Sequence, residues 1–455
     1  MSFKSINPAT GEVVKEIPED KSKTIENKIE KAHKTFREWR ATIISERTSL
    51  LNKLADTLEK NLESLSKLIT EEMGKPIRQA EAEVKKCAWV CRHYAEKAPD
   101  LLAEKPVETD ASYSGVRYEP LGVILGVMPW NFPLWQFFRF AVPAIAAGNT
   151  IVLKHASNVP RCALAIEEIF RESGAPEGLV EVLMIPSKKV KDVIKHELIR
   201  GVSLTGSTEA GMKVAQEAGK HILPSVMELG GSDPFIVLED AILRDAARIG
   251  IIARMQNNGQ SCIAAKRFIV ADVVAPKFTE LMKEQINRLK VGDPLDPETD
   301  IGPLARKDLV ETLHEQVKDS VKKGARVLVG GNKMKNLPGF YYAPTLMIDV
   351  APGMPVFDEE TFGPVLPITV GHSTEEMIEL ANQSEYGLGA SIWTLDSDLA
   401  KQLIPELETG MVFVNAMVRS DPRLPFGGVK KSGYGRELGD HGIYEFVNIK
   451  TVWIG

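Results

Sequence analysis

The sequence predicts an α/β protein with two domains, each built around a parallel sheet. The chain has 455 residues, which is too long for one ordinary domain. Its first hundred residues repeat apolar positions at helical spacing. From residue 121 onward, short apolar runs alternate with helical segments, which is typical of βαβ units around parallel strands.

The N-terminal region is predicted to be helical. Apolar residues recur every three or four positions over 22–39 and 45–73, as in amphipathic helices. Another helix is expected over about 78–97, where Cys87 and Cys91 would share one face. Free cysteine is among the most buried residue types, so we interpret both as core residues.

Two series of apolar runs predict the strands of two sheets. The first series comprises Leu121–Val127, Thr150–Leu153, Val180–Met184 and Val202–Leu204. The second comprises Phe235–Leu238, Phe268–Val270, Val327–Val329, Val365–Val370 and Met411–Val414. Helical segments separate the members of each series, which predicts crossover connections and a parallel sheet in each domain.

Two further segments, Val116–Ile124 and Phe446–Ile454, alternate like strands but have no obvious helix to cover them. An unpaired strand edge invites pairing with another chain. Both segments are therefore candidates for contacts between subunits.

Composition and charge exclude several classes of protein. The 56 Lys and Arg residues and 62 Asp and Glu residues give a net charge of −6 and are interspersed, which argues against binding to nucleic acid or an anionic membrane. The chain has no long apolar run and no apolar leader, so we expect a cytoplasmic protein. Its four cysteines form neither a disulfide framework nor a zinc motif, and no metal is expected.

Two segments carry residues suited to covalent catalysis. The turn 257–262 delivers Cys262 to an apolar segment, where its thiol and its own N–H could face a cleft. In the segment 227–231, Glu228 precedes two glycines that allow a close approach, and a half-buried carboxylate is a potential general base. Taken singly, these residues are better explained as a buried core cysteine and a solvated glutamate.

Two other segments are suited to binding. The prolines of 129–133 restrain Asn131, and a restrained amide is a good oxyanion donor. In 203–211 a strand meets a Gly-Ser turn and then a helix, whose free N–H groups suit a phosphate. This last pattern is not GxGxxG and is weak by itself.

Seven motifs in order resemble the signature set of the aldehyde dehydrogenase superfamily, and they extend over nearly the entire chain. They are Pro-Trp-Asn-Phe-Pro (129–133), Leu-Lys (153–154), Thr-Gly-Ser-Thr-Glu-Ala-Gly (205–211), Glu-Leu-Gly-Gly (228–231), Gly-Gln-Ser-Cys (259–262), Glu-Glu-Thr-Phe-Gly-Pro (359–364) and Pro-Phe-Gly-Gly-Val-Lys-Lys-Ser-Gly (425–433). The resemblance favours the catalytic interpretation of each motif.

The resemblance implies a Rossmann-like cofactor domain with a five-stranded parallel sheet, a catalytic α/β domain and a small β flap that builds homodimers or homotetramers. The implied boundaries are 1–106 with 125–229 for the cofactor domain, 230–431 for the catalytic domain, and 107–124 with 432–455 for the flap.

The family's chemistry is NAD(P)-dependent oxidation of an aldehyde to an acid through a thioester. Carried to matching positions, it implies that Cys262 is the nucleophile, that Asn131 and the Cys262 N–H form the oxyanion hole, and that Glu228 activates water. A cysteine hydrolase or a CoA-dependent acyl transferase is the alternative with the same nucleophile. Glu228 argues against the CoA-dependent version, since a base for water has no use there.

The resemblance also implies the cofactor contacts, which are Trp130, Lys154, Ser157, Gly206, Ser207, Leu229, Glu360 and Phe362. Many family members carry a glutamate where this chain has Ser157. A carboxylate would repel a 2′-phosphate, whereas serine beside Lys154 leaves room for it. We therefore expect NADP to be used at least as well as NAD.

For the substrate, the chain is similar to succinate semialdehyde dehydrogenases at Arg139, which would hold a substrate carboxylate. Trp135, Ser261 and Ser420 would line the same site. An arginine in so aromatic a helix needs a partner, and a protein carboxylate would serve equally. Succinate semialdehyde is thus the expected substrate, and a broad aliphatic, lactaldehyde or glycolaldehyde dehydrogenase with a structural Arg139 is the alternative.

Overall fold

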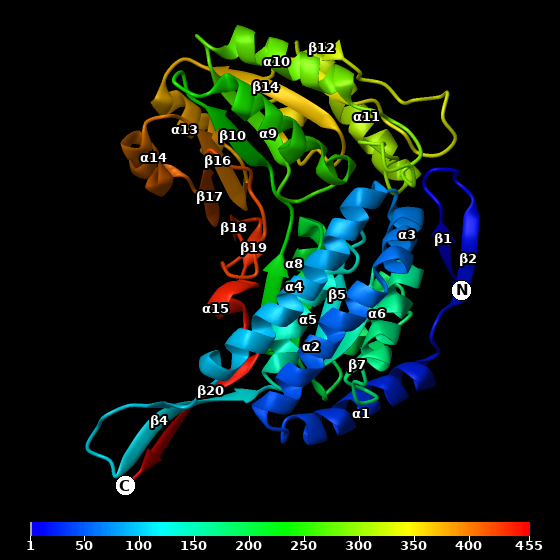
Figure 1. Cartoon of the computed structure of the whole chain (residues 1–455), viewed down its shortest axis with the longest axis vertical. Coiled ribbons are helices and arrows are strands. Elements are labelled where there is room, and N and C mark those ends of the chain that lie inside the picture. Colours follow the sequence, from blue (N-terminus) through cyan, green and yellow to red (C-terminus); the bar gives the residue numbers. More distant parts are fainter. Residues whose placement is uncertain (1) are drawn as a thin grey trace.

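The computed structural model describes residues 2–455, and the region after its first hairpin is helical as predicted (Figure 1). The elements here are β1 (Ser2–Ile6), β2 (Val13–Pro18), α1 (Ser22–Trp39), α2 (Ile44–Lys60), α3 (Leu62–Met73) and α4 (Ile77–Leu101). The helix predicted over 45–73 is two helices, separated at Asn61. The Asn61 side-chain amide donates to the Thr57 carbonyl (3.0 Å), and such bonds compete with the regular helix.

The first sheet has five parallel strands in the order β7, β6, β5, β8, β9, and the short β19 pairs antiparallel with β9. These strands are β5 (Val123–Met128), β6 (Thr150–His155), β7 (Val180–Val182), β8 (Ile199–Thr205), β9 (Ser225–Glu228) and β19 (Gly433–Tyr434). The five-stranded parallel sheet that the resemblance implied is confirmed. The strand order reverses at β5, and open α/β sheets bind ligands beyond the carboxyl ends of the strands at that point.

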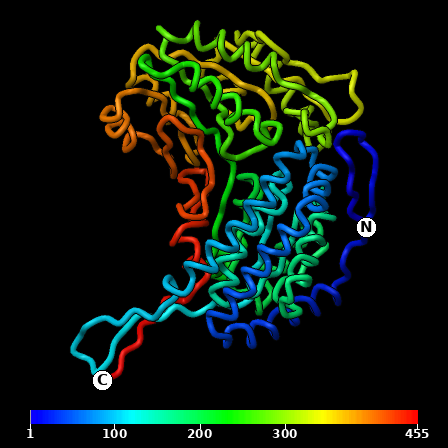
Figure 2. The backbone as a smooth tube through the Cα atoms, in the orientation of Figure 1, coloured from blue at the N-terminus to red at the C-terminus, as the bar shows by residue number. Residues whose placement is uncertain are grey.

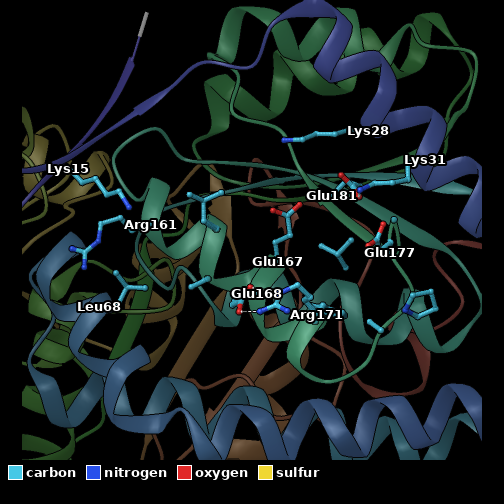
Figure 3. A pocket seen from close by; sticks show the side chains of 17 residues that line it. Lys15, Lys28, Lys31, Leu68, Arg161, Glu167, Glu168, Arg171, Glu177 and Glu181 are labelled. Carbon is cyan, nitrogen blue, oxygen red and sulfur yellow. Dashed lines mark hydrogen bonds and ion pairs between the residues drawn. The ribbon is translucent and has the colours of Figure 1, made fainter.

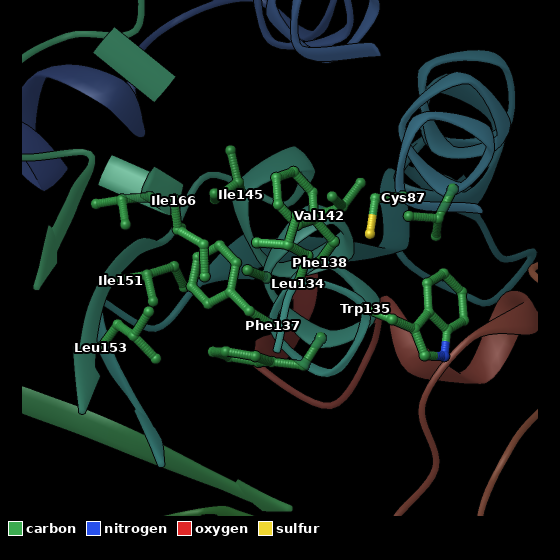
Figure 4. Close-up of a cluster of buried hydrophobic side chains, with 14 of the residues drawn as sticks. Cys87, Leu134, Trp135, Phe137, Phe138, Val142, Ile145, Ile151, Leu153 and Ile166 are labelled. Carbon is green, nitrogen blue, oxygen red and sulfur yellow. The ribbon is translucent and has the colours of Figure 1, made fainter. Parts of the chain in front are cut away.

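Helices pack against this sheet and fix the residues that follow its strands. They include α5 (Trp135–Ala146), α6 (Pro160–Glu172), α7 (Val190–Ile194) and α8 (Thr208–Lys220). Figure 4 shows how α5 buries Phe137 and Phe138 among apolar side chains, with Cys87 in the same cluster. Cys87 and Cys91 are fully buried free thiols, which confirms that they are core residues, and Cys162 is buried in the same way.

The second sheet has seven strands in the order β12, β13, β14, β11, β10, β16, β17, all parallel except β12. They are β10 (Asp233–Val237), β11 (Ala265–Ala271), β12 (Arg326–Val329), β13 (Thr345–Ile348), β14 (Val365–Gly371), β16 (Gly389–Trp393) and β17 (Met411–Val414). The main helices around it are α9 (Leu243–Met255), α10 (Ala275–Arg288), α11 (Lys307–Lys322), α13 (Thr374–Asn382) and α14 (Ser397–Leu403). No helix in residues 2–455 combines the length and the apolar character that crossing a membrane requires.

The strands β9, β13 and β16 were not predicted. Each has only four or five residues, and alternating or continuous apolar patterns are weak over so short a stretch. The hairpin of β1 and β2 was also missed, because β2 is exposed along most of its length and carries no buried apolar face.

A separate antiparallel sheet joins β20 (Val447–Ile454), β4 (Tyr113–Pro120) and β3 (Lys105–Pro106), and it projects from the body of the molecule (Figures 1 and 2). The two strand segments predicted to have free edges therefore pair with each other. The prediction of one strand over Val116–Ile124 is wrong: β4 ends at Pro120 and β5 begins at Val123 in another sheet. Gly122, with φ of +146°, makes the turn between them.

Candidate active site

Cys262 lies in a tightly held loop between α9 and β11. The loop begins with Asn257 and Asn258, both in the left-handed region with φ of 55° and 58° and both fully buried. The Asn257 amide Nδ2 donates to the carbonyl oxygens of Asn131 (2.7 Å) and Gln260 (2.9 Å). A strained backbone held by buried side-chain bonds is common at functional sites, and here it precedes the cysteine singled out from the sequence.

The same loop binds Asn131, which follows β5. The Asn131 amide Nδ2 donates to the Gln260 carbonyl (3.1 Å), and Asn131 is 5% exposed. Two bonds of opposite direction thus fix the Asn131 segment to the segment that carries Cys262. The second amide hydrogen of Asn131 has no acceptor among residues 2–455 and is available to an oxyanion.

Two cavities meet at Cys262 and Gln136. The larger one, of about 570 Å³, lies beyond the carboxyl ends of β5, β6 and β8, at the point where the strand order reverses. The smaller one, of about 210 Å³, runs between α4, α5 and the loop after β17. Cys262 lines both cavities, so two ligands, one in each cavity, would meet at its sulfur.

The larger cavity brings together seven of the eight residues expected at the cofactor. They are Trp130, Lys154, Gly206, Ser207, Leu229, Glu360 and Phe362. Ser207 begins α8 as its N-cap, accepting from the Ala210 N–H, so free N–H groups of this helix face the cavity end. Burial lowers the pKa of Lys154 to about 8, and its ammonium donates to Ser187 (3.3 Å).

Ser157, the eighth residue, lies elsewhere. Its side chain is exposed and lines a neighbouring cavity of about 330 Å³, together with Lys4 of β1, Glu19 and Asn158. A buried Asn158 Nδ2 without a hydrogen-bond partner in residues 2–455 also belongs to this cavity. The position that distinguishes this chain from many family members is thus next to, but not in, the larger cavity.

Glu360 is held beside the nucleophile by a lysine that the sequence interpretation missed. Lys266 Nζ donates to a Glu360 carboxylate oxygen (2.9 Å) and to the Cys262 carbonyl (2.7 Å). The two glycines after Glu228 permit this arrangement: a Cβ on Gly230 would lie 2.5 Å from Glu360, and one on Gly231 would lie 2.6 Å from the Cys262 carbonyl. Lys266 has no motif signal, because its partners are distant in sequence or on the backbone.

Glu228 ends β9 and is 2% exposed. Neither carboxyl oxygen has a hydrogen-bond partner in residues 2–455, and Glu228 is not among the residues that line the two cavities. Burial, followed by the Glu437 carboxyl, raises the pKa of Glu228 well above its ordinary value, while Arg139 and Arg436 oppose the shift. This shift favours the protonated carboxyl, so Glu228 has to release its proton before it can act as a base.

Arg139 has a protein partner. Its guanidinium forms a buried ion pair with Glu437, donates to Thr205 Oγ1 (3.4 Å) and lies over the Phe426 ring at 4.3 Å. It lines the smaller cavity with the other expected substrate residues, Trp135, Ser261 and Ser420. The alternative interpretation, an arginine that pairs with a carboxylate of the protein, describes the contact that is present.

The thiol of Cys262 is protonated at neutral pH. Burial raises the pKa of Cys262 to about 11, and Arg139 and Lys266 act in the opposite direction. The sequence alone suggested an ordinary thiol with a small thiolate fraction. The structure therefore requires more activation of the nucleophile than that interpretation assumed.

A third cavity, of about 770 Å³, is larger than either of these but lies between α1, α3 and α6, away from Cys262 (Figure 3). Its charged groups are mostly paired within the protein. Lys31 binds Glu181 at 2.6 Å, and Lys28 binds Asp20 at 2.9 Å. Size alone does not indicate the site of chemistry here.

The fold and the site together define a class of protein. The model of the aldehyde dehydrogenase family matches residues 1–452, and the chain belongs to this family. It is 51% identical over 455 residues to a probable succinate-semialdehyde dehydrogenase (NADP+) of Synechocystis, with both chains fully covered. It is 47% identical over 449 residues to the succinate semialdehyde dehydrogenase (NAD(P)+) Sad of Escherichia coli, covering 99% of this chain and 97% of that one.

Solved structures give the same picture. Succinic semialdehyde dehydrogenase from Streptococcus pyogenes, in complex with NADP+, superimposes with a TM-score of 0.97 at 38% identity and 99% coverage of both chains. The fold class predicted from the sequence, the family resemblance and the assignment to aldehyde dehydrogenases are confirmed.

Proposed function

We propose that this protein oxidises succinate semialdehyde to succinate with NADP or NAD, through a covalent intermediate on Cys262. The observation that carries the proposal is the position of Cys262 where two cavities meet, one at the reversal point of a doubly wound sheet and one lined by several cations. The relatives named above support the choice of substrate and cofactor.

The residues of the larger cavity suit a dinucleotide. Lys154 is a buried cation that forms no ion pair in residues 2–455 and faces the cavity, so an anionic group there would relieve its desolvation. The N-terminus of α8 adds free N–H groups for a phosphate. Glu360 offers a carboxylate to a ribose hydroxyl. When bound, the nicotinamide takes up the two electrons and the hydrogen removed from the aldehyde carbon.

The steps on the protein follow from the contacts. The Cys262 thiol first releases its proton to solvent. The thiolate then attacks the aldehyde carbon, and the resulting oxyanion accepts from Asn131 Nδ2 and the Cys262 N–H. Loss of the hydrogen with its electron pair leaves a thioester on Cys262. Glu228 then takes a proton from water, which adds to the thioester carbon and releases the acid and the thiol.

The cofactor preference is proposed from the region around Ser157. Position 157 carries no carboxylate, Lys4 and the Asn158 amide line the cavity there, and Lys154 lines the larger cavity beside it. The carboxylate of Glu19 also lines the cavity at Ser157, but it is paired with Lys189. The positive charges and the amide donor attract a 2′-phosphate. We therefore propose that NADP is used at least as well as NAD.

The substrate is proposed from the charge of the smaller cavity. Four cations line it, namely Arg78, Lys86, Arg139 and Arg419, against the single carboxylate Glu83. An aldehyde that carries a carboxylate matches this lining. The second candidate is a broad aliphatic, lactaldehyde or glycolaldehyde dehydrogenase, and the ion pair of Arg139 with Glu437 favours it.

Initial rates on a panel of aldehydes test both proposals. We expect kcat/KM for succinate semialdehyde to exceed that for butyraldehyde by about tenfold or more, as one charge-assisted hydrogen bond would give, and glutarate semialdehyde is included as a carboxylate-bearing aldehyde that is one carbon longer. Each rate is measured with NAD and with NADP. Equal rates on succinate semialdehyde and butyraldehyde would contradict the substrate, and a preference for NAD above tenfold would contradict the cofactor.

We also propose that the chain forms a homodimer or homotetramer in the cytoplasm. The sheet of β3, β4 and β20 projects from the body, and Ile449, Trp453 and Ile454 of β20 are each more than half exposed, at 61%, 54% and 55%. Burial of such residues against another subunit would remove apolar area from water. Free, unpaired cysteines are typical of a reducing compartment.

A further inference from the structure

The smaller cavity contains a cation that neither the motifs nor the family resemblance singled out. Lys86 lies on α4, and its ammonium donates to the Ser420 hydroxyl at 2.7 Å. It also lies over the Trp135 ring, 4.5 Å from the ring centre. Lys86, Trp135 and Ser420 line the same cavity as the Cys262 sulfur.

The other charged groups of this cavity are engaged with the protein or with solvent. Arg139 is paired with Glu437, and Arg78 with Glu298. Glu83 is ion-paired with Lys75 and accepts from the first N–H groups of α5. Arg419 has an exposed side chain. Lys86 is therefore the inward-facing cation that forms no ion pair with any residue in 2–455.

The surroundings of Lys86 are short of negative charge. Its polar partner is the neutral Ser420 hydroxyl. Of the charged groups that act on it from other elements, Arg139 and Arg419 are cations, and the Asp421 carboxylate is paired with Arg423. A half-buried ammonium without a counter-ion is unfavourable, and it becomes favourable when a ligand supplies the anion. Trp135 fixes the ammonium by a cation–π contact, and Ser420 is positioned to donate to the same anion.

We propose that Lys86, with Ser420 as the second donor, binds the carboxylate of the aldehyde substrate and so determines the preference for semialdehydes over uncharged aldehydes. This inference rests on the proposed function. Arg139 then pairs with Glu437 and lowers the pKa of Glu228 by its charge. Lys86 is the specificity-determining residue.

The test compares two four-carbon aldehydes, succinate semialdehyde and butyraldehyde, in matched variants. Lys86→Met keeps an unbranched side chain that is one heavy atom shorter and can still pack on Trp135, but it removes the charge. We expect KM for succinate semialdehyde to rise about 10- to 100-fold, with kcat and the butyraldehyde parameters within about twofold of wild type. Lys86→Arg should retain most of the preference. Lys85→Met, one residue earlier and facing solvent, should change nothing.

Three outcomes would overturn the inference. The first is Lys86→Met with unchanged kcat/KM for succinate semialdehyde. The second is an equal loss on both aldehydes, which would indicate a structural role. The third is a loss confined to succinate semialdehyde in Arg139→Met but absent from Lys86→Met.

Product inhibition separates this inference from the proposed substrate. Succinate is measured as a competitive inhibitor of butyraldehyde oxidation, so the result does not depend on which aldehyde is physiological. We expect its Ki to rise at least about tenfold in Lys86→Met. If wild type prefers no semialdehyde yet the Ki rises, the proposed substrate fails and the anion site stands. No inhibition of wild type, or an unchanged Ki, overturns the anion site.

The pH dependence provides an independent readout. Burial lowers the pKa of Lys86 to about 8; Arg139 and Arg419 act in the same direction, and Cys87 and Asp421 in the opposite one. Glu83 also faces this space from α4. Above about pH 8 the ammonium loses its charge, so KM for succinate semialdehyde should rise in wild type but stay flat in Lys86→Arg. Butyraldehyde at saturating cofactor is the control, because Cys262 and Lys154 affect both aldehydes. A flat KM in wild type up to about pH 10 overturns the inference.

Discussion

At the scale of single residues, burial of Glu228 raises the pKa of its carboxyl and also lowers the stability of the folded chain. Its carboxyl has no hydrogen-bond partner in residues 2–455, and burial raises its pKa well above the ordinary value. A carboxyl with a raised pKa stays neutral at a pH where a solvated carboxyl has ionised. It can therefore act as a general base only when a neighbouring group or a change of position favours the ionised carboxylate.

The same raised pKa predicts a pH-dependent stability. Below the ordinary carboxyl pKa, Glu228 is protonated in both the folded and the unfolded chain, so it contributes no pH dependence. As the pH rises above that value, only the unfolded chain releases the proton, and the free energy of unfolding falls. Glu228→Gln cannot ionise, so its melting temperature should exceed that of wild type at pH 8 by more than at pH 5.5.

Thermal melts at the two pH values check this expectation. The exposed Glu63, changed to Gln, is the control and should show the same small difference at both. A difference for Glu228→Gln that does not grow with pH would show that the buried carboxyl is already ionised in the folded protein.

Among the residues of the site, those within local motifs were predictable and those joined by tertiary contacts were not. Cys262, Asn131 and Glu228 lie in short segments with glycine or proline at fixed positions, so local chemistry singles them out. Glu437 meets Arg139 across 298 residues of sequence. Lys266 and Lys86 carry no motif at all, and only packing shows that the first contacts Glu360 and that the second faces the cavity.

At the scale of elements, the loop before Cys262 depends on two asparagines with different partners. Asn257 ties the loop to the Asn131 carbonyl, whereas the Asn258 amide donates to the carbonyls of Gly74 (2.9 Å) and Pro303 (2.8 Å). Both have a positive φ, where a side chain with a Cβ is strained. Only the first connects the segments proposed to form the oxyanion hole.

Asn257→Gly should therefore separate strain from positioning. Glycine accepts the left-handed backbone, so this variant should be more stable than Asn257→Ala by about 1 kcal/mol. Both variants lose the tether to Asn131, and kcat should fall about tenfold or more in each. Asn258→Gly is the matched control, with kcat expected within about twofold of wild type.

Melting temperatures and steady-state rates give the answer. Equal stability of the glycine and alanine variants would mean that the positive φ is not strained. An unchanged kcat in both would mean that Asn257 does not position Asn131.

The elements themselves were predicted with mixed success, for physical reasons. The helices of the first hundred residues and the longer strands have enough residues to show a period. The apolar series across Val116–Ile124 could not reveal the turn at Gly122, because consecutive strands in different sheets have the same local pattern. The pairing of β4 with β20 joins segments that are more than 300 residues apart, and no local signal encodes it.

At the scale of the whole molecule, the candidate active site lies between the two sheets. The first supplies Asn131 and Glu228 from the ends of β5 and β9, and the second supplies Cys262 from the loop before β11. Neither sheet carries the full set of groups. The bonds that join Asn131 to Asn257 and to Gln260, in the loop that carries Cys262, are thus bonds between the two halves of the molecule, and they set the geometry of the reacting groups.

Single-turnover measurement of Glu228→Ala tests the covalent route most directly. If Cys262 forms a thioester that Glu228 helps water to hydrolyse, this variant mixed with NADP and succinate semialdehyde should give one burst of reduced cofactor per site and then stop. Mass spectrometry should find an acyl group on Cys262, and Cys262→Ala should give neither signal. A Glu228→Ala enzyme that shows no burst and no acyl-enzyme, or that turns over at the wild-type rate, would contradict the mechanism.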